Sequence, residues 1–437
     1  MASKAWVLAG RELRGRRSSR IGVALVVALG GGAALGSAIA AHRTDHAYHD
    51  YVERADVSDL TINPGVWSTD MDRAMRELDG VRSVRAHTMF VATAAWTGPT
   101  TVDHPPAEDY WVLMSGSTEG SFLEADRPVV TDGRLPFGTR EMFVGNGYRH
   151  TLEQIVGREL DVGDVVDLGF WWSLLFDRPV APGTVVSPIS VEPVTISGFG
   201  RFPDEVLPDD LFPQQQVVLS PDLAARHSCI APLSTSMTLE EVDEATAPRT
   251  CSSQYWFYSL ELEPGVTEQD IRDQFATVAD RLNLEELPTA LRDIGATHFY
   301  IGQARSDVDE AVRRTTRPAV TALVLFAIVS AAVTASILAL MAVRAVRRAH
   351  GGHSTLRVLG ATRRQRVTWS VLPLLQAAGL GVVGAGAVAA ALSPIGPLGA
   401  VRSVQAGWSV SMPGVVMIPG LVLITVAAAV VIVAAGA

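Results

Sequence analysis

Residues 318–343 read PAVTALVLFAIVSAAVTASILALMAV, an uncharged run of mostly apolar side chains. A helix rises about 1.5 Å per residue, so about 20 such residues cross the hydrocarbon core of a bilayer. Three further runs of this kind occur, and 48% of all 437 residues are hydrophobic. The sequence therefore predicts an integral membrane α-helical protein. We place its four transmembrane helices at residues 21–42, 317–346, 367–392 and 413–437.

Charge is sorted sharply along the chain. Residues 43–316 hold 45 acidic and 21 basic side chains, a formal charge of −24, whereas the rest holds 15 basic side chains and the single acidic residue Glu12. The basic clusters flank the apolar runs at Lys4–Arg20 and Arg344–Arg366, where the positive-inside rule places cytoplasmic segments. This predicts a cytoplasmic N-terminus (residues 1–20), an extracytoplasmic segment 43–316, a cytoplasmic loop 347–366 and an external loop 393–412. We expect no nucleic acid among the partners of this net acidic chain.

The first apolar run has two interpretations. Its basic start, apolar core and Ala38-Ile39-Ala40 also satisfy the three regions of a cleaved signal peptide. The run is long for that purpose, and Gly32 and Gly36 form a G-x-x-x-G pair suited to close helix packing. We favour an uncleaved helix, with Gly381 of the third run as a further packing position.

The segment between the first and second helices has the pattern of a large external α+β domain. Strand, helix and strand signals follow one another near residues 56–97 and again near 255–301, which predicts two β-α-β units. Between them, residues 100–250 are rich in Pro, Gly and short β runs, which predicts a mostly β insertion. Ser306-x-x-Asp309 is a capping pattern that would open the helix leading into residues 317–346.

No catalytic, cofactor or metal site stands out. Lys4 is the only lysine, which excludes a P-loop, and Gly379-Leu-Gly381-Val-Val-Gly384 lacks the strand and acidic residue that a dinucleotide site needs. His42, His46 and His49 fit a metal-binding helix face or, more simply, a hydrated stalk. Cys229 and Cys251 lie in the external segment and form either a disulfide bridge or two unpaired thiols.

Several motifs together resemble one family. Residues 355–365, TLRVLGATRRQ, are similar to the "LRALGASRRQ" element of FtsX/MacB-type permeases of ABC transporters. Residues 127–136, 141–144 and 162–168 resemble the "P-x-x-x-x-G-R-x-P", "E-V-x-V" and "V-G-D-x-x-x-L" elements of the external domain, which is MacB-like. Residues 6–14 resemble the amphipathic helix before the first span. The resemblance covers nearly the whole chain.

The resemblance implies a non-catalytic permease subunit of mechanotransmission type, driven by a separate cytoplasmic ABC ATPase. It also implies a second permease unit and an envelope protein or lipoprotein as partners. The segment implied to contact the ATPase comprises Leu356, Arg357, Leu359, Gly360, Ala361, Arg363 and Arg364. The alternative is a membrane-anchored extracytoplasmic binding or signalling receptor, whose basic loop binds anionic lipid instead.

The last apolar run ends the sequence at Val433–Ala437 without a basic anchor. Relatives of this Ala/Arg-rich kind often carry a second copy of the four-helix unit. We therefore expect either a first half of a longer permease or a single unit that pairs with another.

Overall fold

The structure is a computed structural model. It describes residues 17–64, 69–101, 111–171, 181–203, 217–228, 252–281, 300–301, 304–358, 362–405 and 410–436. The chain divides into two compact units. The helical unit comprises Met1–Tyr48, Arg313–Arg402 and Gly407–Ala437, and the sheet unit comprises His49–Val312 with Ser403–Ala406.

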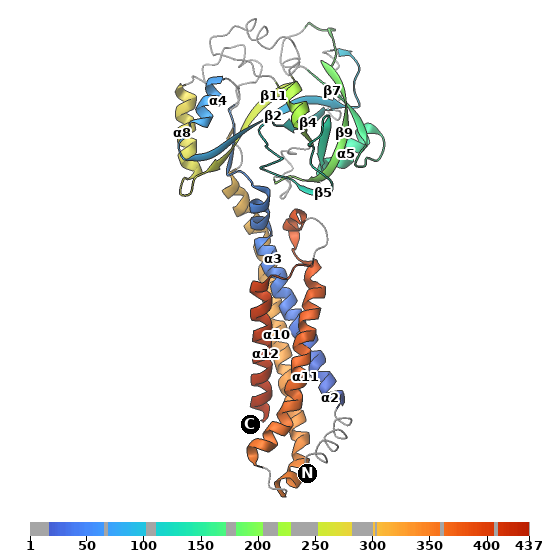
Figure 1. Cartoon of the computed structure of the whole chain (residues 1–437), viewed down its shortest axis with the longest axis vertical. Coiled ribbons are helices and arrows are strands. Elements are labelled where there is room, and N and C mark those ends of the chain that lie inside the picture. The colour runs from blue at the N-terminus through green and yellow to red at the C-terminus, as the bar shows by residue number, and fades with distance from the viewer. Residues whose placement is uncertain are drawn as a thin grey trace. The chain divides into compact units, whose positions relative to one another are not determined.

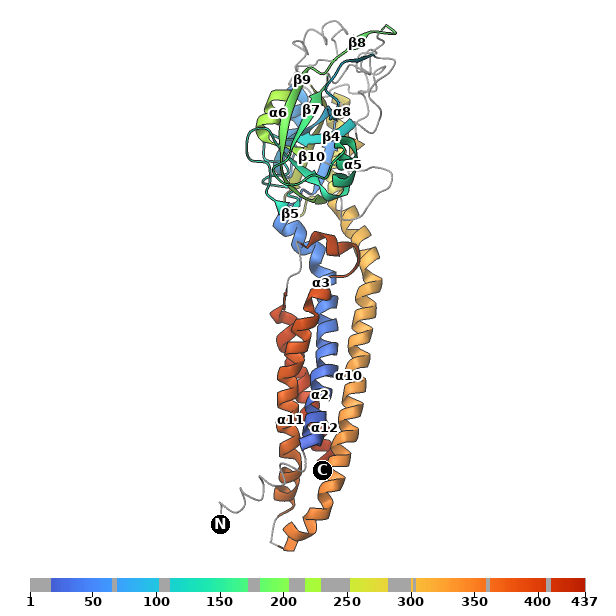
Figure 2. The ribbon, with the colours of Figure 1, turned by 90° about the vertical axis from the view of Figure 1, so that its right-hand side faces the viewer.

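Four helical segments are long and apolar enough to cross a membrane: Ser19–Ala55, Arg305–Arg348, Ser370–Ile395 and Gly414–Ala435. The first is built from α2 (Arg17–Val26), a π-helical turn η1 (Val27–Gly31) and α3 (Gly32–Ala55). The others lie in α10 (Arg305–Val358), α11 (Arg363–Leu392) and α12 (Gly414–Gly436), and two short 3-10 turns, η5 (Ser393–Ile395) and η6 (Gly399–Val404), follow α11. In the helical unit, α10 runs along the side of the bundle next to α2 and α3 (Figure 2).

The bundle has a narrow core of small and branched side chains. Val23 and Val27 of the first helix pack there with Leu338 of α10, Leu374 of α11 and Ile432 of α12. The outward faces are also apolar, and most of the apolar surface of α10 and α12 is exposed. A helix that is hydrophobic on every side is typical of a membrane span.

The sheet unit contains one mixed sheet of ten described strands, in the order β12-β1-β11-β2-β4-β10-β6-β9-β5, with β7 pairing β2 and β9. A separate pair joins β3 (Thr100–Thr101) to β8 (Val185–Val186). The other strands are β1 (Leu60–Asn63), β2 (Val81–Ala94), β4 (Trp111–Gly116), β5 (Val129–Gly133), β6 (Glu141–Gly145), β7 (Val165–Phe170), β9 (Ser190–Arg201), β10 (Val217–Leu219), β11 (Ser253–Leu262) and β12 (Tyr300–Ile301).

Two β-α-β units interlock at one end of the sheet. β1 leads through α4 (Thr69–Arg76) to β2, and β11 leads through α8 (Glu268–Arg281) to β12. β11 pairs antiparallel with both β1 and β2, and β12 pairs with β1. This is the order of a split β-α-β fold. α4 and α8 lie side by side on one face (Figure 1), where Met71, Met75 and Phe275 are buried against Ile62 and Tyr258.

The chain between β2 and β11 forms a second lobe on the same sheet. β2 has 14 residues, of which residues 81–90 pair with β11 and residues 88–94 pair with β4 and β7. The described helices of this lobe are α5 (Asn146–Val156) and α6 (Pro221–His227). Its core contains Phe90, Met114, Leu168, Phe170 and Phe199, all buried. One long strand thus joins the α+β part to the β-rich insertion.

Candidate functional site: the junction of two long helices with the sheet

The C-terminus of α3 ends in a tight cap within the sheet unit. Asp56 adopts a left-handed backbone with φ of 54°, and the Val57 amide donates to the Val52 carbonyl at 3.2 Å. This is the hydrogen bond of a Schellman cap, in which glycine usually takes the left-handed position. A short polar side chain such as Asp tolerates that conformation better than most. The cap turns the chain from α3 directly toward β1.

A segment of the β-rich lobe covers this helix end. The Arg127 amide donates to the Ala55 carbonyl at 3.0 Å, and the Asp126 amide donates to the Asp56 carbonyl at 3.0 Å. The Tyr51 hydroxyl donates to the Arg127 carbonyl at 3.2 Å, and the Arg127 guanidinium donates to the Arg54 carbonyl. The last carbonyls of a helix have no partner within the helix. Residues 126–127 supply those partners from another part of the fold.

The Asp126 carboxylate links the same lobe to the chain that follows α3. Its two oxygens accept the Ser58 amide at 2.8 Å and the Ser58 hydroxyl at 2.7 Å. Burial raises the pKa of Asp126, and the hydrogen bonds from Ser58 and Ser259 and the charge of Arg85 oppose that rise. A buried carboxylate with these donors holds residues 57–59 in one position.

The first residue of α10 is bonded to the same segment, residues 57–59. The Arg305 guanidinium lies 2.7 Å from the Asp59 carboxylate, whose other oxygen accepts the Leu262 amide of β11 at 2.7 Å. The Arg305 amide donates to the Asp59 carbonyl at 2.9 Å. One carboxylate therefore connects the sheet to the first residue of α10. We call residues 51–59, 126–127 and 305–306 the junction.

Glu268 adds a second tie at the first turn of α10. Its carboxylate accepts the Ser306 hydroxyl at 2.8 Å and the Ser306 amide at 3.3 Å. The prediction that Ser306 caps this helix is wrong, because α10 begins at Arg305 and the Ser306 hydroxyl bonds Glu268 of α8 instead. The analogous pattern at the start of α8 is a true capping box, since Thr267 and Asp270 exchange hydrogen bonds at 2.9 and 3.2 Å.

The predicted packing glycines lie against neighbouring helices of the bundle. A Cβ added to Gly32 would come within 2.5 Å of the Val388 Cβ of α11, and one added to Gly381 within 2.7 Å of the Val27 Cβ. Gly36 leaves somewhat more room, at 3.1 Å from a terminal methyl of Leu392. The first helix and α11 therefore approach each other along a line where side chains larger than hydrogen do not fit.

Four of the predicted ATPase-coupling residues lie at the facing ends of α10 and α11 in the sequence. The helix α10 ends at Val358, so it includes Leu356 and Arg357, and α11 begins with Arg363 and Arg364. Thr362 caps α11 in a capping box with Gln365, at 3.3 Å and 3.0 Å for the two hydrogen bonds. Leu359, Gly360 and Ala361 lie outside the described residues. Cys229, Cys251 and residues 1–16, which include the predicted N-terminal amphipathic helix, do as well.

The sequence offered little signal for the junction. Asp59, Asp126 and Arg305 are single charged residues among the many of an acidic segment, and only folding brings the three segments of the junction together. Over the described parts of the chain, no group of three or more His, Cys, Asp or Glu side chains could hold a metal ion. The junction is held by hydrogen bonds and an ion pair.

The sequence matches no protein-family profile and no curated protein. Several solved structures resemble part of the chain, and two of them are domains of transporters. The extracellular domain of the noncanonic ABC-type transporter YknZ from Gram-positive bacteria aligns over 56% of this chain and 100% of its own, with 14% identity and a TM-score of 0.27. The periplasmic region of MacB from Actinobacillus actinomycetemcomitans aligns over 61% and 99%, with 10% identity and a TM-score of 0.26. At these identities and TM-scores the similarity identifies neither a family nor a function.

Proposed function

We propose that the chain is a membrane permease subunit of an ABC transporter of mechanotransmission type. It couples ATP hydrolysis by a separate cytoplasmic ATPase to movement of the extracytoplasmic sheet unit, and it is not itself an enzyme. The four apolar helical segments, the acidic segment between the first and second, and the motifs of residues 127–168 and 355–365 support this proposal. The cargo would be a lipoprotein, a peptide or a lipid, or the movement would control an envelope partner.

The observation that carries the proposal is the continuity of α10. It is a single helix of 54 residues that starts at the junction and ends at Val358, beside the predicted coupling segment. At 1.5 Å per residue it is about 80 Å long. Arg305 and Ser306 tie its first turn to the sheet unit through Asp59 and Glu268. A displacement of the cytoplasmic end would therefore be passed to the strands as a pull on β1 and β11.

Coupling of this kind needs an element with two arrangements that both ends can bias. The turn between α10 and α11 is a suitable place for the ATPase to act, because its basic residues favour the cytoplasm and Thr362 fixes where α11 starts. A second permease unit would complete the transporter. The N-terminus would be cytoplasmic, and residues 43–316 extracytoplasmic.

Co-purification with a cytoplasmic ABC ATPase tests the proposal. The variants Leu359→Asp, Gly360→Asp and Arg363→Asp should each lose the ATPase, because each adds a negative charge to a segment whose charged side chains are otherwise basic. Arg402→Asp reverses a charge in the predicted external loop and serves as the matched control, which should retain it.

A chain in which residues 355–365 are scrambled separates this proposal from the receptor alternative. Scrambling keeps the charge, so binding of the loop to anionic lipid should persist, whereas docking of an ATPase should be lost. Retention of the ATPase by the scrambled chain and by all three Asp variants would refute the coupling site.

A further inference from the structure

The first candidate span changes its helical geometry along its length. α2 and α3 are α-helical, and Val27–Gly31 between them form the π-helical turn η1. A π-turn holds one residue more than an α-turn, and such turns are rare in helices and frequent at functional positions. Within the described parts of the chain, the other three candidate spans contain no π-helical turn.

The π-turn keeps one stripe of the first helix directed to the same side. The buried residues of this stripe follow one another at intervals of four and are Val23, Val27, Gly31, Leu35 and Ile39. In an α-helix each interval of four turns by about 40° beyond a full circle, so the stripe would rotate by about 160° from Val23 to Ile39. The extra residue of the π-turn removes about 100° of that rotation.

Both ends of the stripe contact the same two helices. The residues of the stripe in α2 and η1 pack in one cluster with Leu374 of α11 and Ile432 of α12. Those in α3 pack with Ala389 of α11, and Ile424 of α12 lies against that second cluster. A first helix that was α-helical throughout would turn one end of the stripe away from these neighbours.

The π-turn ends in glycines that lie against α10 and α12. A Cβ added to Gly30 would overlap the Thr334 Oγ1 of α10, and one added to Gly31 would lie 3.4 Å from the Ile424 side chain of α12. The Thr334 hydroxyl donates to the Ser330 carbonyl at 2.6 Å, which holds this side chain beside Gly30. Glycine has a low helix propensity, so a turn that contains it leaves α-geometry more readily than one built from alanine.

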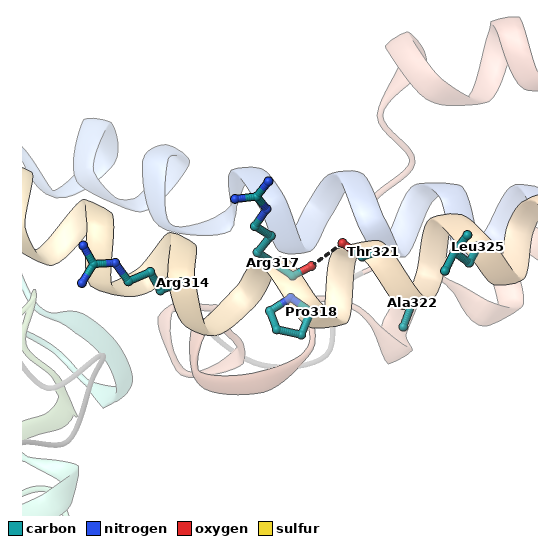
Figure 3. A pocket seen from close by; sticks show the side chains of 6 residues that line it. All are labelled: Arg314, Arg317, Pro318, Thr321, Ala322 and Leu325. Carbon is teal, nitrogen blue, oxygen red and sulfur yellow. Dashed lines mark hydrogen bonds between the residues drawn. The ribbon is translucent and has the colours of Figure 1, made fainter.

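α10 keeps its register even where it contains a proline. Pro318 lies inside this helix and has no backbone N–H to donate. Figure 3 shows the ribbon of α10 continuing through Pro318, beside the hollow that extends from Arg314 to Leu325. The Thr321 hydroxyl donates to the Arg317 carbonyl at 2.8 Å, within the same helix. A change of register in the bundle therefore falls on the first helix.

The first helix and α10 are joined at one end. α3 ends at the junction, and the first residue of α10 is bonded there through Arg305 and Asp59. If α10 moves along its axis, the junction transmits the movement to α3, and the first helix must either move as a whole or change its length. Conversion of a π-turn to α-geometry lengthens a helix by about 1.5 Å, because the extra residue then contributes a full rise.

We propose that Val27–Gly31 is a register switch of the first helix, in which conversion of the π-turn to α-geometry turns α2 by about 100° and shifts it by about 1.5 Å relative to α3. The inference rests on the proposed function, because the force would come from an ATPase at the cytoplasmic ends of α2 and α10. In this division α10 transmits the movement at constant register, and the first helix accommodates it at the π-turn.

Cysteine cross-linking of the full-length chain, in complex with a cytoplasmic ABC ATPase, tests the switch. A Cβ added to Gly22 of α2 would lie 2.8 Å from the terminal methyl group of Met341 of α10, so Gly22→Cys with Met341→Cys reports the orientation of α2. The control pair is Gly36→Cys with Leu392→Cys on the α3 side, where an added Cβ at Gly36 would lie 3.1 Å from Leu392. Copper phenanthroline forms the disulfides, and mass spectrometry of the linked peptides quantifies each pair separately from the native cysteines.

The complex is compared without nucleotide and with a non-hydrolysable ATP analogue whose binding is measured in the same sample. The link between positions 22 and 341 should fall by about twofold or more when the analogue binds, because a rotation of about 100° turns position 22 away from α10. The link between positions 36 and 392 should not change, since α3 keeps its orientation toward α11.

Deletion of Gly30 removes the extra residue and should fix the first helix in α-geometry. Both parts of the stripe then keep their neighbours, so the variant should unfold in SDS at the same concentration as the wild type and retain the ATPase. Its link between positions 22 and 341 should form and no longer respond to the analogue. Deletion of Ser37 is the matched control, because it removes one residue within α3, turns the end of the stripe by about 100° and should lower the SDS concentration of unfolding.

Four results would overturn the register switch. The first is a link between positions 22 and 341 that is equal with and without the bound analogue. The second is an equal response of the control pair, which would indicate movement of whole helices. The third is a Gly30 deletion that still responds to the analogue, and the fourth is a Gly30 deletion that is no more stable than the Ser37 deletion, which would show that the turn holds no extra residue.

Retention of the ATPase separates the two proposals. If no ABC ATPase co-purifies with the chain, the proposed function fails, and the switch fails with it because no force acts on α2. If the ATPase is retained and binds the analogue while the link between positions 22 and 341 does not respond, only the register switch fails.

Discussion

Replacement of Gly381 by alanine tests how closely the first helix and α11 pack. A Cβ at this position would lie 2.7 Å from the Val27 Cβ and 2.8 Å from the Ala24 carbonyl oxygen. The second of these atoms belongs to the backbone and cannot rotate away. Gly379 lies two residues earlier in the same helix, and a Cβ there would meet no atom within 4 Å. The two glycines form a matched pair.

Comparison of Gly381→Ala with Gly379→Ala isolates the steric cost of an added methyl group at Gly381. Alanine stabilises a helix relative to glycine by about 1 kcal/mol, and this gain applies to both positions. Overpacking of a close-packed site costs about 1–3 kcal/mol, and only Gly381→Ala incurs it. We expect Gly379→Ala to be as stable as the wild type or up to about 1 kcal/mol more stable. Gly381→Ala should be about 1–3 kcal/mol less stable than Gly379→Ala.

The assay is unfolding of the full-length chain in mild detergent by added SDS, followed by circular dichroism of the helices. Gly36→Ala should fall between the two variants, because its nearest neighbour is the end of the flexible Leu392 side chain at 3.1 Å. Equal stability of Gly381→Ala and Gly379→Ala would refute the close approach of the two helices. The order of the three variants would then have no steric basis.

Two further predictions concern the sheet unit. His87 is buried between Phe122 and Phe257, at ring distances of 4.9 and 5.2 Å, and burial lowers its pKa to about 3. Because the folded pKa of His87 lies below its unfolded value of about 6.5, His87 should lower the free energy of unfolding as pH falls from 6.5 toward 3. The variant His87→Phe should remove this pH dependence when stability is measured by thermal unfolding. A pH–stability curve that stays the same in the variant would contradict the burial argument. At the junction, a double-mutant cycle of Asp59→Asn and Arg305→Gln should give a coupling energy for unfolding of about 1 kcal/mol or less. Each single variant should also show faster hydrogen exchange of the backbone amides in the first turn of α10. Additive effects of the two variants on that exchange would show that the ion pair does not hold the helix.

The composition of the chain and the distribution of charge along it predicted much of the architecture. The four apolar runs correspond to helices long enough to cross a bilayer, because the hydrophobic requirement for a span is local and can be counted residue by residue. The strand and helix signals near residues 56–97 and 255–301 likewise correspond to β1, α4, β2, β11 and α8, since alternation and capping patterns act over a few residues.

Local sequence patterns could not predict which distant segments of the chain pair with each other. Each β-α-β unit is visible in the sequence, but the insertion of β11 between β1 and β2 is decided by packing of the whole sheet. The π-helical turn at Val27–Gly31 is invisible in an apolar run, because it depends on how the first helix meets its neighbours. Ser306 shows the same limit, since its hydroxyl had a local capping partner in the sequence and bonds Glu268 in the structure.

The sequence by itself thus determined which segments are apolar enough to span a membrane, and that Lys4 is the only lysine that a phosphate site could use, since hydropathy and residue identity are local properties. The tertiary structure alone decided that Arg305 pairs with Asp59, that Asp126 bonds Ser58, and that α10 is tied to the sheet at its first turn. Those features depend on distances between residues far apart in the chain, which only folding sets.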